Sequence, residues 1–376
     1  MSLEVDLAQK QLSVPNKLLL ALYAVIPLSL LAAFIDSLFF GHAMREVLPS
    51  NPGQLMWWAI IFNFPHIISS LITLVDKEYI RHYKPQFKKA LWIIVPGVLF
   101  INFAIPFILP DKGAMFAYGL FFVFFAAYTM YHVLSQQFGI GMMMMGVRPD
   151  SRYEHWRYLS SIAATLMYLL AFAGPNLKTA QWGAYNLYDI VQLVAAVFVV
   201  VASLAGFRLV REGTKSIGII YVSANIFMLY AVWILCFMEY SVFVVLIPRF
   251  VHDVTAFIIY SVHDQNRNRI VRHNLIYRAL SVFKLAPVVL CPLIALFLAN
   301  FIECGAYFID FGLGFNPALN SECFATHYYS PNVENALPDH MRLGMQIMFI
   351  CGFFHYHIES FVWKRESIHR HSISFS

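Results

Sequence analysis

Charged residues are scarce in this chain: Asp, Glu, Lys and Arg make up 12% of its 376 residues, whereas hydrophobic residues make up 60%. Soluble domains carry about 25% charged residues, so this composition excludes an ordinary soluble globular domain. The net charge of +5 falls mainly between long apolar stretches, and no basic segment accompanies a soluble fold. We therefore expect an all-α integral membrane protein that has no nucleic-acid partner.

Other features that the chain lacks restrict the class of protein further. The chain has only five cysteines, and they do not offer a set of soft thiolate ligands. It shows no internal repeat, whereas transporter folds often carry inverted repeats, so a transporter is the less favoured alternative. The apolar stretch that starts at residue 18 is too long for a signal-peptide core and lacks a small-residue cleavage pattern after it. We expect it to be retained as the first membrane span.

Ten stretches are long and apolar enough to be membrane spans, since a spanning helix needs about 20 mostly apolar residues. We expect one membrane domain over residues 1–376, folded as a polytopic helix bundle. Prolines inside the spans predict kinks, which neighbouring helices can accommodate. The spans are expected at 18–41, 54–75, 90–109, 114–135, 157–174, 189–206, 216–238, 241–263, 283–302 and 342–363.

The distribution of basic residues predicts the orientation of these spans. Of the 26 Lys and Arg residues, 21 fall in the N-terminal tail, the C-terminal tail and the alternate loops on their side. The opposite loops hold only Arg45, Lys112 and Lys178. By the positive-inside rule both termini are expected in the cytoplasm. The expected location is the bacterial cytoplasmic (inner) membrane.

The longest loop on the outer side, residues 303–341, contains no Lys or Arg and five acidic residues. It carries Cys304 and Cys323. A disulfide between them is permitted outside the cytoplasm, and closing a loop of this size would contribute about 3 kcal/mol. The alternative is two free thiols. The other cysteines, Cys236, Cys291 and Cys351, are expected to pack within spans.

Histidines lie within or at the ends of several apolar stretches, and most have a carboxylate or amide nearby. An ionisable side chain in hydrocarbon costs about 2.5–3.5 kcal/mol even on lenient scales, so it indicates function. We predict an intramembrane metal or proton site in the cytoplasmic half. The candidate metal ligands are His66, His132, His252, His263, His355 and His357, and the candidate catalytic carboxylates are Asp253, Asp264 and Glu359.

Helical spacing places several of these residues on common faces. His252 and His263 are 11 residues apart, close to three helical turns, and the aspartates that follow them repeat this spacing. Arg249 precedes Asp253 by four residues and can pair with it. The plainer alternative is that this pair exists only to make the arginine tolerable in the span.

The last span repeats this pattern on a smaller scale. His355 and Glu359 share a face at a spacing of four residues, as do His132 and Gln136 at the end of an earlier span. His357 points away from His355 by about 160° on a helix, so we do not expect both to bind one metal ion.

Neutral imidazole and carboxylate groups suit iron, zinc or manganese. A set of His66, His132, His263 and His355 with an acidic residue resembles a non-haem iron site, in which carboxylates bind the metal or orient the imidazoles. The alternative for any one histidine is a plain hydrogen-bonded contact between helices. The remaining histidines, in loops and tails, are expected to be solvated: His42, His82, His155, His273, His327, His340, His369 and His371.

The order of the motifs resembles that of a group of bacterial multi-pass membrane proteins of unassigned activity. The resemblance spans most of the chain. It rests on Pro65-His66, on His132 to Gly139 with the pattern His-x3-Gln-x-Phe-Gly, on His252-Asp253 and His263-Asp264, and on the final span from His355 to Trp363-Lys364.

In kind, the chain is also similar to the histidine-rich membrane oxygenases. These include fatty-acid desaturases and hydroxylases, alkane hydroxylases and the bacterial carotene-cleaving dioxygenase. The desaturase boxes His-x3-His and His-x2-His-His are absent, and no two histidines are adjacent. The histidine pattern is therefore compatible with a mononuclear four-histidine site or with a mixed histidine–carboxylate site.

The function expected from the sequence is that of a non-haem metal oxidoreductase, with iron as the expected metal. Its partners would be a lipophilic substrate reached through membrane lipid, and an electron donor. The alternatives are a proton-coupled transporter or channel that uses the same His, Asp and Arg groups, a haem-binding electron carrier with axial histidines such as His66 and His252, and a scaffold protein.

Overall fold

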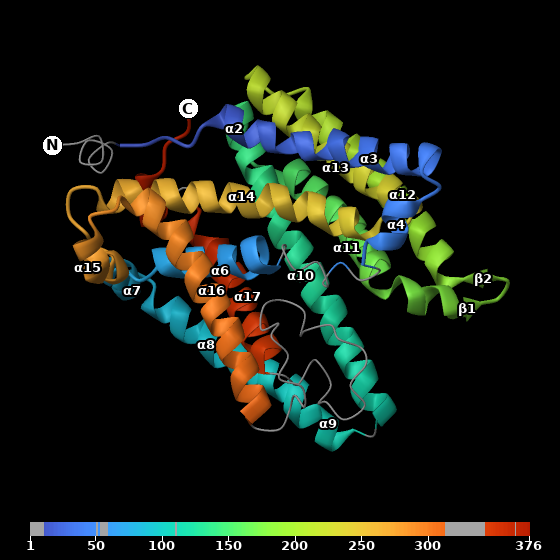
Figure 1. Ribbon diagram of the computed structural model, residues 1–376. Coiled ribbons are helices and arrows are strands. Elements are labelled where there is room, and N and C mark those ends of the chain that lie inside the picture. The colour runs from blue at the N-terminus through green and yellow to red at the C-terminus, as the bar shows by residue number, and fades with distance from the viewer. Residues whose placement is uncertain (1–10, 50–51, 53–58, 110, 313–342, 365) are drawn as a thin grey trace. The chain divides into compact units, whose positions relative to one another are not determined.

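The regular structure of the chain is almost entirely helical (Figure 1), as the composition predicts. The computed structural model describes residues 11–49, 52, 59–109, 111–312, 343–364 and 366–376. Within these residues the strands are β1 (Gln181–Trp182) and β2 (Tyr185–Asn186), which form a short antiparallel hairpin with Gln181 opposite Asn186. The all-α prediction is therefore confirmed for the described part of the chain.

Seven helical segments among the described residues are long and apolar enough to cross a membrane, as in a multi-pass membrane protein. Each overlaps one of the expected spans. They are Asn16–Phe39, Lys84–Ala104, Ser151–Thr179, Leu187–Val210, Ser216–Phe237, Ser241–Asn268 and Pro287–Ala306.

The three other expected spans also coincide with helical segments. Residues 114–135 lie within α10 (Asp111–Met145), and 342–363 nearly coincide with α17 (Leu343–Val362). The stretch 54–75 contains a shorter apolar helix, Ile61–Thr73. The count of ten spans and the orientation of the termini stay predictions.

The chain forms two compact units. Unit 1 comprises Met1–Pro15, Met56–Phe121 and Asp253–Ser376, and unit 2 comprises Asn16–Leu55 and Phe122–His252. Two long helices contribute to both units, because the divisions fall inside α10 and inside α14 (Ser241–Asn268).

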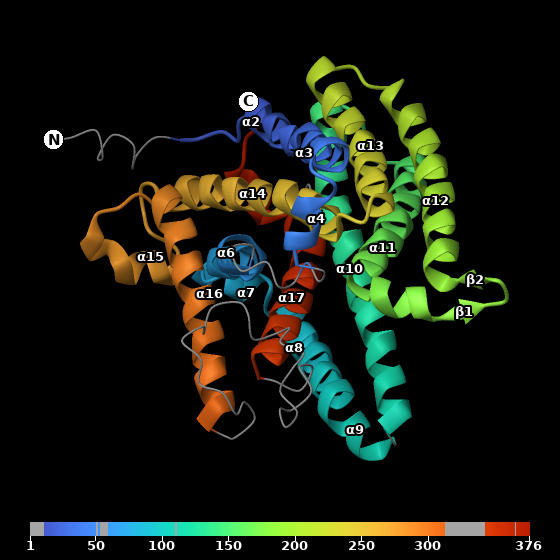
Figure 2. The ribbon, with the colours of Figure 1, turned by 45° about the vertical axis from the view of Figure 1, so that its right-hand side comes forward.

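In unit 1, α6 (Phe64–Thr73) is the central helix. It packs against α16 (Pro287–Gly312) and α17, and α17 packs in turn against α8 (Lys84–Leu99). Figures 1 and 2 both show α6 beside α16. Nearly every side chain of α6 is buried, so residues on this helix are well placed to form a site closed to water. The remaining elements of this unit are η3 (Ala59–Asn63), α7 (Lys77–His82), η4 (Phe100–Ala104), α9 (Ile105–Ile108), α15 (Leu275–Ala279), η5 (Leu280–Phe283) and η8 (Ile368–Ser372).

In unit 2, α11 (Ser151–Thr179) and α12 (Leu187–Val210) pack along each other, and α13 (Ser216–Phe237) packs against both. The N-terminal helices α2 (Asn16–Ala21) and α3 (Val25–Phe39), joined by η1 (Leu22–Ala24), lie against α13. The short α4 (Ala43–Val47) follows α3.

Side-chain caps explain where several helices begin. Asp76 accepts hydrogen bonds from the backbone of α7, Asp150 caps α11, and Asn274 caps α15. Each cap satisfies backbone N–H groups that have no partner within the helix.

The segment expected to form the long outer loop begins later than the sequence predicts. Helix α16 continues to Gly312, about ten residues past the expected end of its span at 302. Cys323 lies outside the described residues, so the disulfide between Cys304 and Cys323 stays a prediction. Cys236, Cys291 and Cys351 are free thiols in the described part.

The contact between α13 and the end of α10 depends on the absence of a side chain at Gly218. A Cβ atom at this position would lie 2.1 Å from the backbone nitrogen of Met145 and 2.3 Å from the carbonyl carbon of Met144. We expect Gly218→Ala to lower the stability of the protein by about 1–3 kcal/mol, because backbone must move to admit the methyl group.

The matched control for this substitution is Gly305→Ala in α16, where a Cβ would meet nothing within 4 Å. Thermal unfolding of both variants in detergent measures the difference. Equal unfolding midpoints for the two variants would contradict the close helix contact.

Candidate metal centre and the polar cluster of unit 1

His66 is completely buried near the start of α6, directly after Pro65 at the first turn. Its Nδ1 lies 3.1 Å from the carbonyl oxygen of Phe62 and 3.3 Å from Oδ1 of Asp253 on α14. Both neighbours are acceptors, so Nδ1 carries the proton and Nε2 carries the lone pair. This is the arrangement in which a carboxylate orients a metal-binding imidazole.

His355 on α17 is held in the same tautomer by Ser70, which lies one turn after His66 on α6. The Ser70 Oγ donates to the carbonyl oxygen of Ile67 at 2.7 Å. The same Oγ therefore accepts from Nδ1 of His355, from which it is 2.6 Å away. As in His66, the lone pair of His355 is then on Nε2.

His66 and His355 come together from different helices of unit 1. Their ring centroids are 5.2 Å apart with the ring planes at 82°, and each offers a ligand nitrogen within 4.8 Å of one offered by the other. Glu359 lies one turn after His355 on α17, and its Oε1 is 3.7 Å from the His355 Nδ1. All three side chains and Asp253 are buried.

The donor set fits a borderline divalent metal. Two neutral imidazoles and one or two carboxylates match the preferences of iron, zinc and manganese, and two histidines with one carboxylate are the ligands of many non-haem iron sites. We therefore take His66 and His355 as the candidate ligands, with Asp253 and Ser70 as orienting groups and Glu359 as the carboxylate beside His355. Asp253, predicted as catalytic, lies against a histidine in this arrangement.

Unit 2 contains a second histidine pair. The rings of His132 on α10 and His252 on α14 have centroids 5.1 Å apart at an interplanar angle of 85°, and both side chains are buried. Arg249, one turn before His252 on α14, lies close enough to His132 for its positive charge to interact with that imidazole. The expectation that the histidines of all four helices share one centre stays a prediction.

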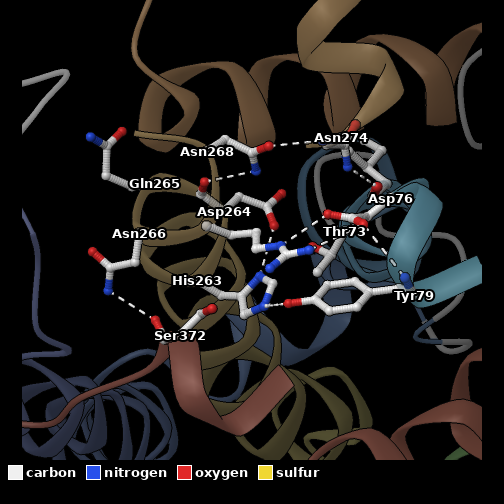
Figure 3. Close-up of polar contacts among 12 residues, drawn as sticks. Thr73, Asp76, Tyr79, His263, Asp264, Gln265, Asn266, Asn268, Asn274 and Ser372 are labelled. Carbon is white, nitrogen blue, oxygen red and sulfur yellow. Dashed lines mark hydrogen bonds and ion pairs between the residues drawn. The ribbon is translucent and has the colours of Figure 1, made fainter. Parts of the chain in front are cut away.

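The structure places His263 and Asp264 in a polar cluster at the end of α14 (Figure 3). Tyr79 donates through its hydroxyl to Nε2 of His263 at 3.0 Å, and Nδ1 of His263 donates to Oδ1 of Asp264 at 2.9 Å. The Tyr277 hydroxyl donates to the other oxygen of Asp264. Both ring nitrogens of His263 are thus engaged, so this residue is not among our candidate ligands.

An arginine closes one side of the polar cluster. Arg267 contacts both oxygens of Asp76, at 3.0 and 3.3 Å, and also pairs with Glu78. Its guanidinium carbon lies 4.8 Å from the centre of the Tyr79 ring. Because Asp76 also caps α7, the ion pair ties the end of α14 to the start of that helix.

His369 on η8 covers the cluster and was not predicted by the sequence, which suggested a solvated tail residue. Its ring is fully buried and stacks on Tyr79, with centroids 3.7 Å apart, and on His263, with centroids 4.9 Å apart. The tail is fixed further by pairing of Val14 with Ser374 and Ser376. No local sequence pattern distinguishes this histidine from the exposed His371 beside it.

His357 differs from the other predicted ligands. It is only partly buried, and its ring packs edge to face against Phe361, 5.6 Å away, on the same helix. This agrees with the expectation that His357 and His355 point in different directions, and we leave His357 out of the candidate centre.

The sequence pattern does not predict the hydroxyl groups that complete both clusters. Ser70 and Tyr79 lie on helices distant in sequence from their partners, whereas Tyr277 lies on α15, the helix that follows that of Asp264. Serine and tyrosine are common in apolar helices, so only the fold identifies them.

No protein family, curated protein or solved structure matches this chain. The assignment of a function therefore rests on the residues and their geometry.

The pKa of His369 is held below its ordinary value, because burial disfavours the charged imidazole and the nearby His263, Arg267 and His82 disfavour it further. The folded state then binds fewer protons than the unfolded tail, so the tail loses stability as the pH falls below the ordinary histidine pKa of about 6.5. We expect the amides of residues 366–376 to lose protection as the pH is lowered from 7.5 to 5.5, once the measured exchange rates are corrected for intrinsic exchange.

His369→Phe is the matched variant for this prediction, because it keeps an aromatic ring on Tyr79 but cannot take up a proton. Its tail should exchange at nearly the same rate at both pH values, after correction for intrinsic exchange. The same acceleration in both proteins would show that His369 is not the titrating group.

Tyr277→Phe removes a donor to the buried carboxylate of Asp264. We expect a loss of about 1–3 kcal/mol, because the carboxylate oxygen loses its compensation for burial. Tyr185→Phe in the exposed β2 strand is the control. Thermal unfolding in detergent compares the two, and an unfolding midpoint unchanged in Tyr277→Phe would contradict the network.

Proposed function

We propose that the protein is an integral-membrane non-haem metalloenzyme, an oxidoreductase that binds iron in unit 1 and acts on a lipophilic substrate. The observation that carries this proposal is the approach of His66 and His355 to each other from α6 and α17, next to two buried carboxylates. Such groups are costly within apolar helices unless they serve a site.

The orientation of the two imidazoles supports metal binding over simple helix pairing. In each histidine an acceptor fixes the proton on Nδ1: Phe62 and Asp253 for His66, and Ser70 for His355. The proton arrangement therefore presents two Nε2 lone pairs.

The carboxylates have separate roles in this proposal. Asp253 accepts from the His66 ring and raises its basicity as a ligand. Glu359 is on the same helix face as His355, with its Oε1 3.7 Å from the His355 Nδ1, and we propose it as the nearby carboxylate that can join the two histidines. When it is not a ligand, its position beside the centre allows it to hold or release a proton.

The expected metal is iron because this ligand set is typical of non-haem iron enzymes that use O2. Iron bound there would supply the redox chemistry for oxygenation, hydroxylation or desaturation. The surrounding helices are apolar, with exposed Leu, Ile, Val and Phe side chains facing outward, which supports a substrate that arrives from the lipid phase. An electron donor is part of this proposal.

Metal analysis of the purified full-length protein tests the proposal. We expect about one iron per chain after gentle purification, and a strong loss in His66→Gln and in His355→Gln because each removes a ligand. Ser70→Ala should lower metal affinity by about 10–100-fold, since it removes only an orienting group.

His155→Gln, an exposed histidine on α11, is the matched control and should keep its metal. Sub-stoichiometric iron, zinc and manganese in the unaltered protein would overturn the proposal. Full metal retention in both ligand variants would move the site away from unit 1.

A further inference from the structure

A basic and apolar surface lies at one end of unit 1, in the connection between α14 and α16. We call residues 269–285 the basic cap. The sequence has no acidic residue between Asp264 and Glu303. Within the cap the basic residues are Arg269, Arg272, Arg278 and Lys284.

The basic side chains of the cap differ in their roles. Arg272 has a structural role, because its guanidinium donates to the carbonyl oxygens of Tyr277 and Leu285 and so holds the cap together. Arg278 and Lys284 are exposed and Arg269 is partly exposed. Among the described residues these three form no ion pair.

Large apolar side chains stand out from the same surface. Val282 is 74% exposed and Phe283 is 62% exposed at the end of η5, and Ile270 is 80% exposed directly after Arg269. Val282 and Phe283 are adjacent in the chain, and neighbouring exposed apolar side chains of this size generally mark an interaction surface.

The position of the cap indicates what covers it. It begins one residue after α14 ends at Asn268 and stops shortly before α16 begins at Pro287. Both helices are long and apolar enough to span a membrane. Phe283 precedes Pro287 by four residues, so it cannot lie farther than about 14 Å from the start of that span.

A neighbouring segment extends the surface. Asp76 and Asn274 form an antiparallel bridge, and Leu275 donates to the carbonyl oxygen of Val75. This joins the cap to α7, and Figures 1 and 2 show α15 and α7 at the same end of unit 1. Helix α7 adds the exposed Lys77 and Arg81.

We infer that the basic cap binds the headgroups of anionic phospholipids, with Val282 and Phe283 inserted at the boundary between headgroups and acyl chains. Basic residues beside apolar ones are the pattern by which surface segments bind anionic bilayers. The attachment of the cap to two spanning helices favours a lipid surface over a soluble acidic protein. The inference is independent of the metal centre.

Native mass spectrometry of the full-length protein in non-ionic detergent tests this inference. The probes are dioleoylphosphatidylglycerol and, for comparison, dioleoylphosphatidylcholine. We expect the anionic lipid to bind more tightly, and Arg269→Gln/Arg278→Gln/Lys284→Gln to weaken its binding by about fivefold per charge removed. We expect the separate variant Val282→Ser/Phe283→Ser also to weaken binding of the anionic lipid, although it leaves the net charge unchanged.

The matched control is Arg208→Gln/Arg211→Gln/Lys215→Gln, which removes three exposed basic residues from unit 2. This control should leave the affinity for phosphatidylglycerol unchanged. Equal affinity for both lipids, or equal losses in both triple variants, would overturn the inference. So would binding of soluble polyglutamate that depends on the cap and exceeds that of phosphatidylglycerol, because it would identify an acidic protein as the partner. Inorganic phosphate should not displace the lipid.

Discussion

Buried imidazoles and carboxylates that have no access to water need hydrogen-bond partners within the protein or a bound ion, and this constraint organises unit 1. Its polar side chains are therefore gathered in clusters rather than scattered along the helices. The hydrogen bond between Ser70 and His355 shows the principle most clearly. The serine hydrogen is directed to Ile67, so the histidine proton is fixed and the opposite ring nitrogen is presented as a base.

Helix α14 carries two carboxylates that serve different clusters. Asp253 lies against His66 within the candidate metal centre, whereas Asp264 lies against His263 in the polar cluster. The spacing of 11 residues puts both on one face of the helix. One helix thereby contributes to a site suited to metal chemistry and to a hydrogen-bonded cluster at its end, which fixes α7, α15 and the C-terminal tail.

The helical class, seven of the spans and the close approach of particular histidines could be anticipated from the sequence. Hydropathy reports burial in lipid directly, and the helical period shows which residues share a face. The pairing of His355 with Glu359 follows from their spacing alone.

Contacts between distant helices could not be anticipated in the same way. His263 carries the same His-Asp motif as His252, yet Tyr79 and Asp264 occupy both of its nitrogens. His369 belongs to a polar tail and is nevertheless buried, because Tyr79 and His263 provide rings on which it stacks. These outcomes depend on which helices become neighbours, and neither composition nor periodicity specifies this.

The central claim is that His66 and His355 present Nε2 atoms to one metal ion together with a carboxylate. X-ray absorption at the iron edge of the purified protein tests it most directly. The account predicts two imidazole nitrogens and at least one carboxylate oxygen in the metal shell, with the imidazole signal reduced in His355→Gln. A shell without imidazole, or one that is identical in this variant, would contradict it.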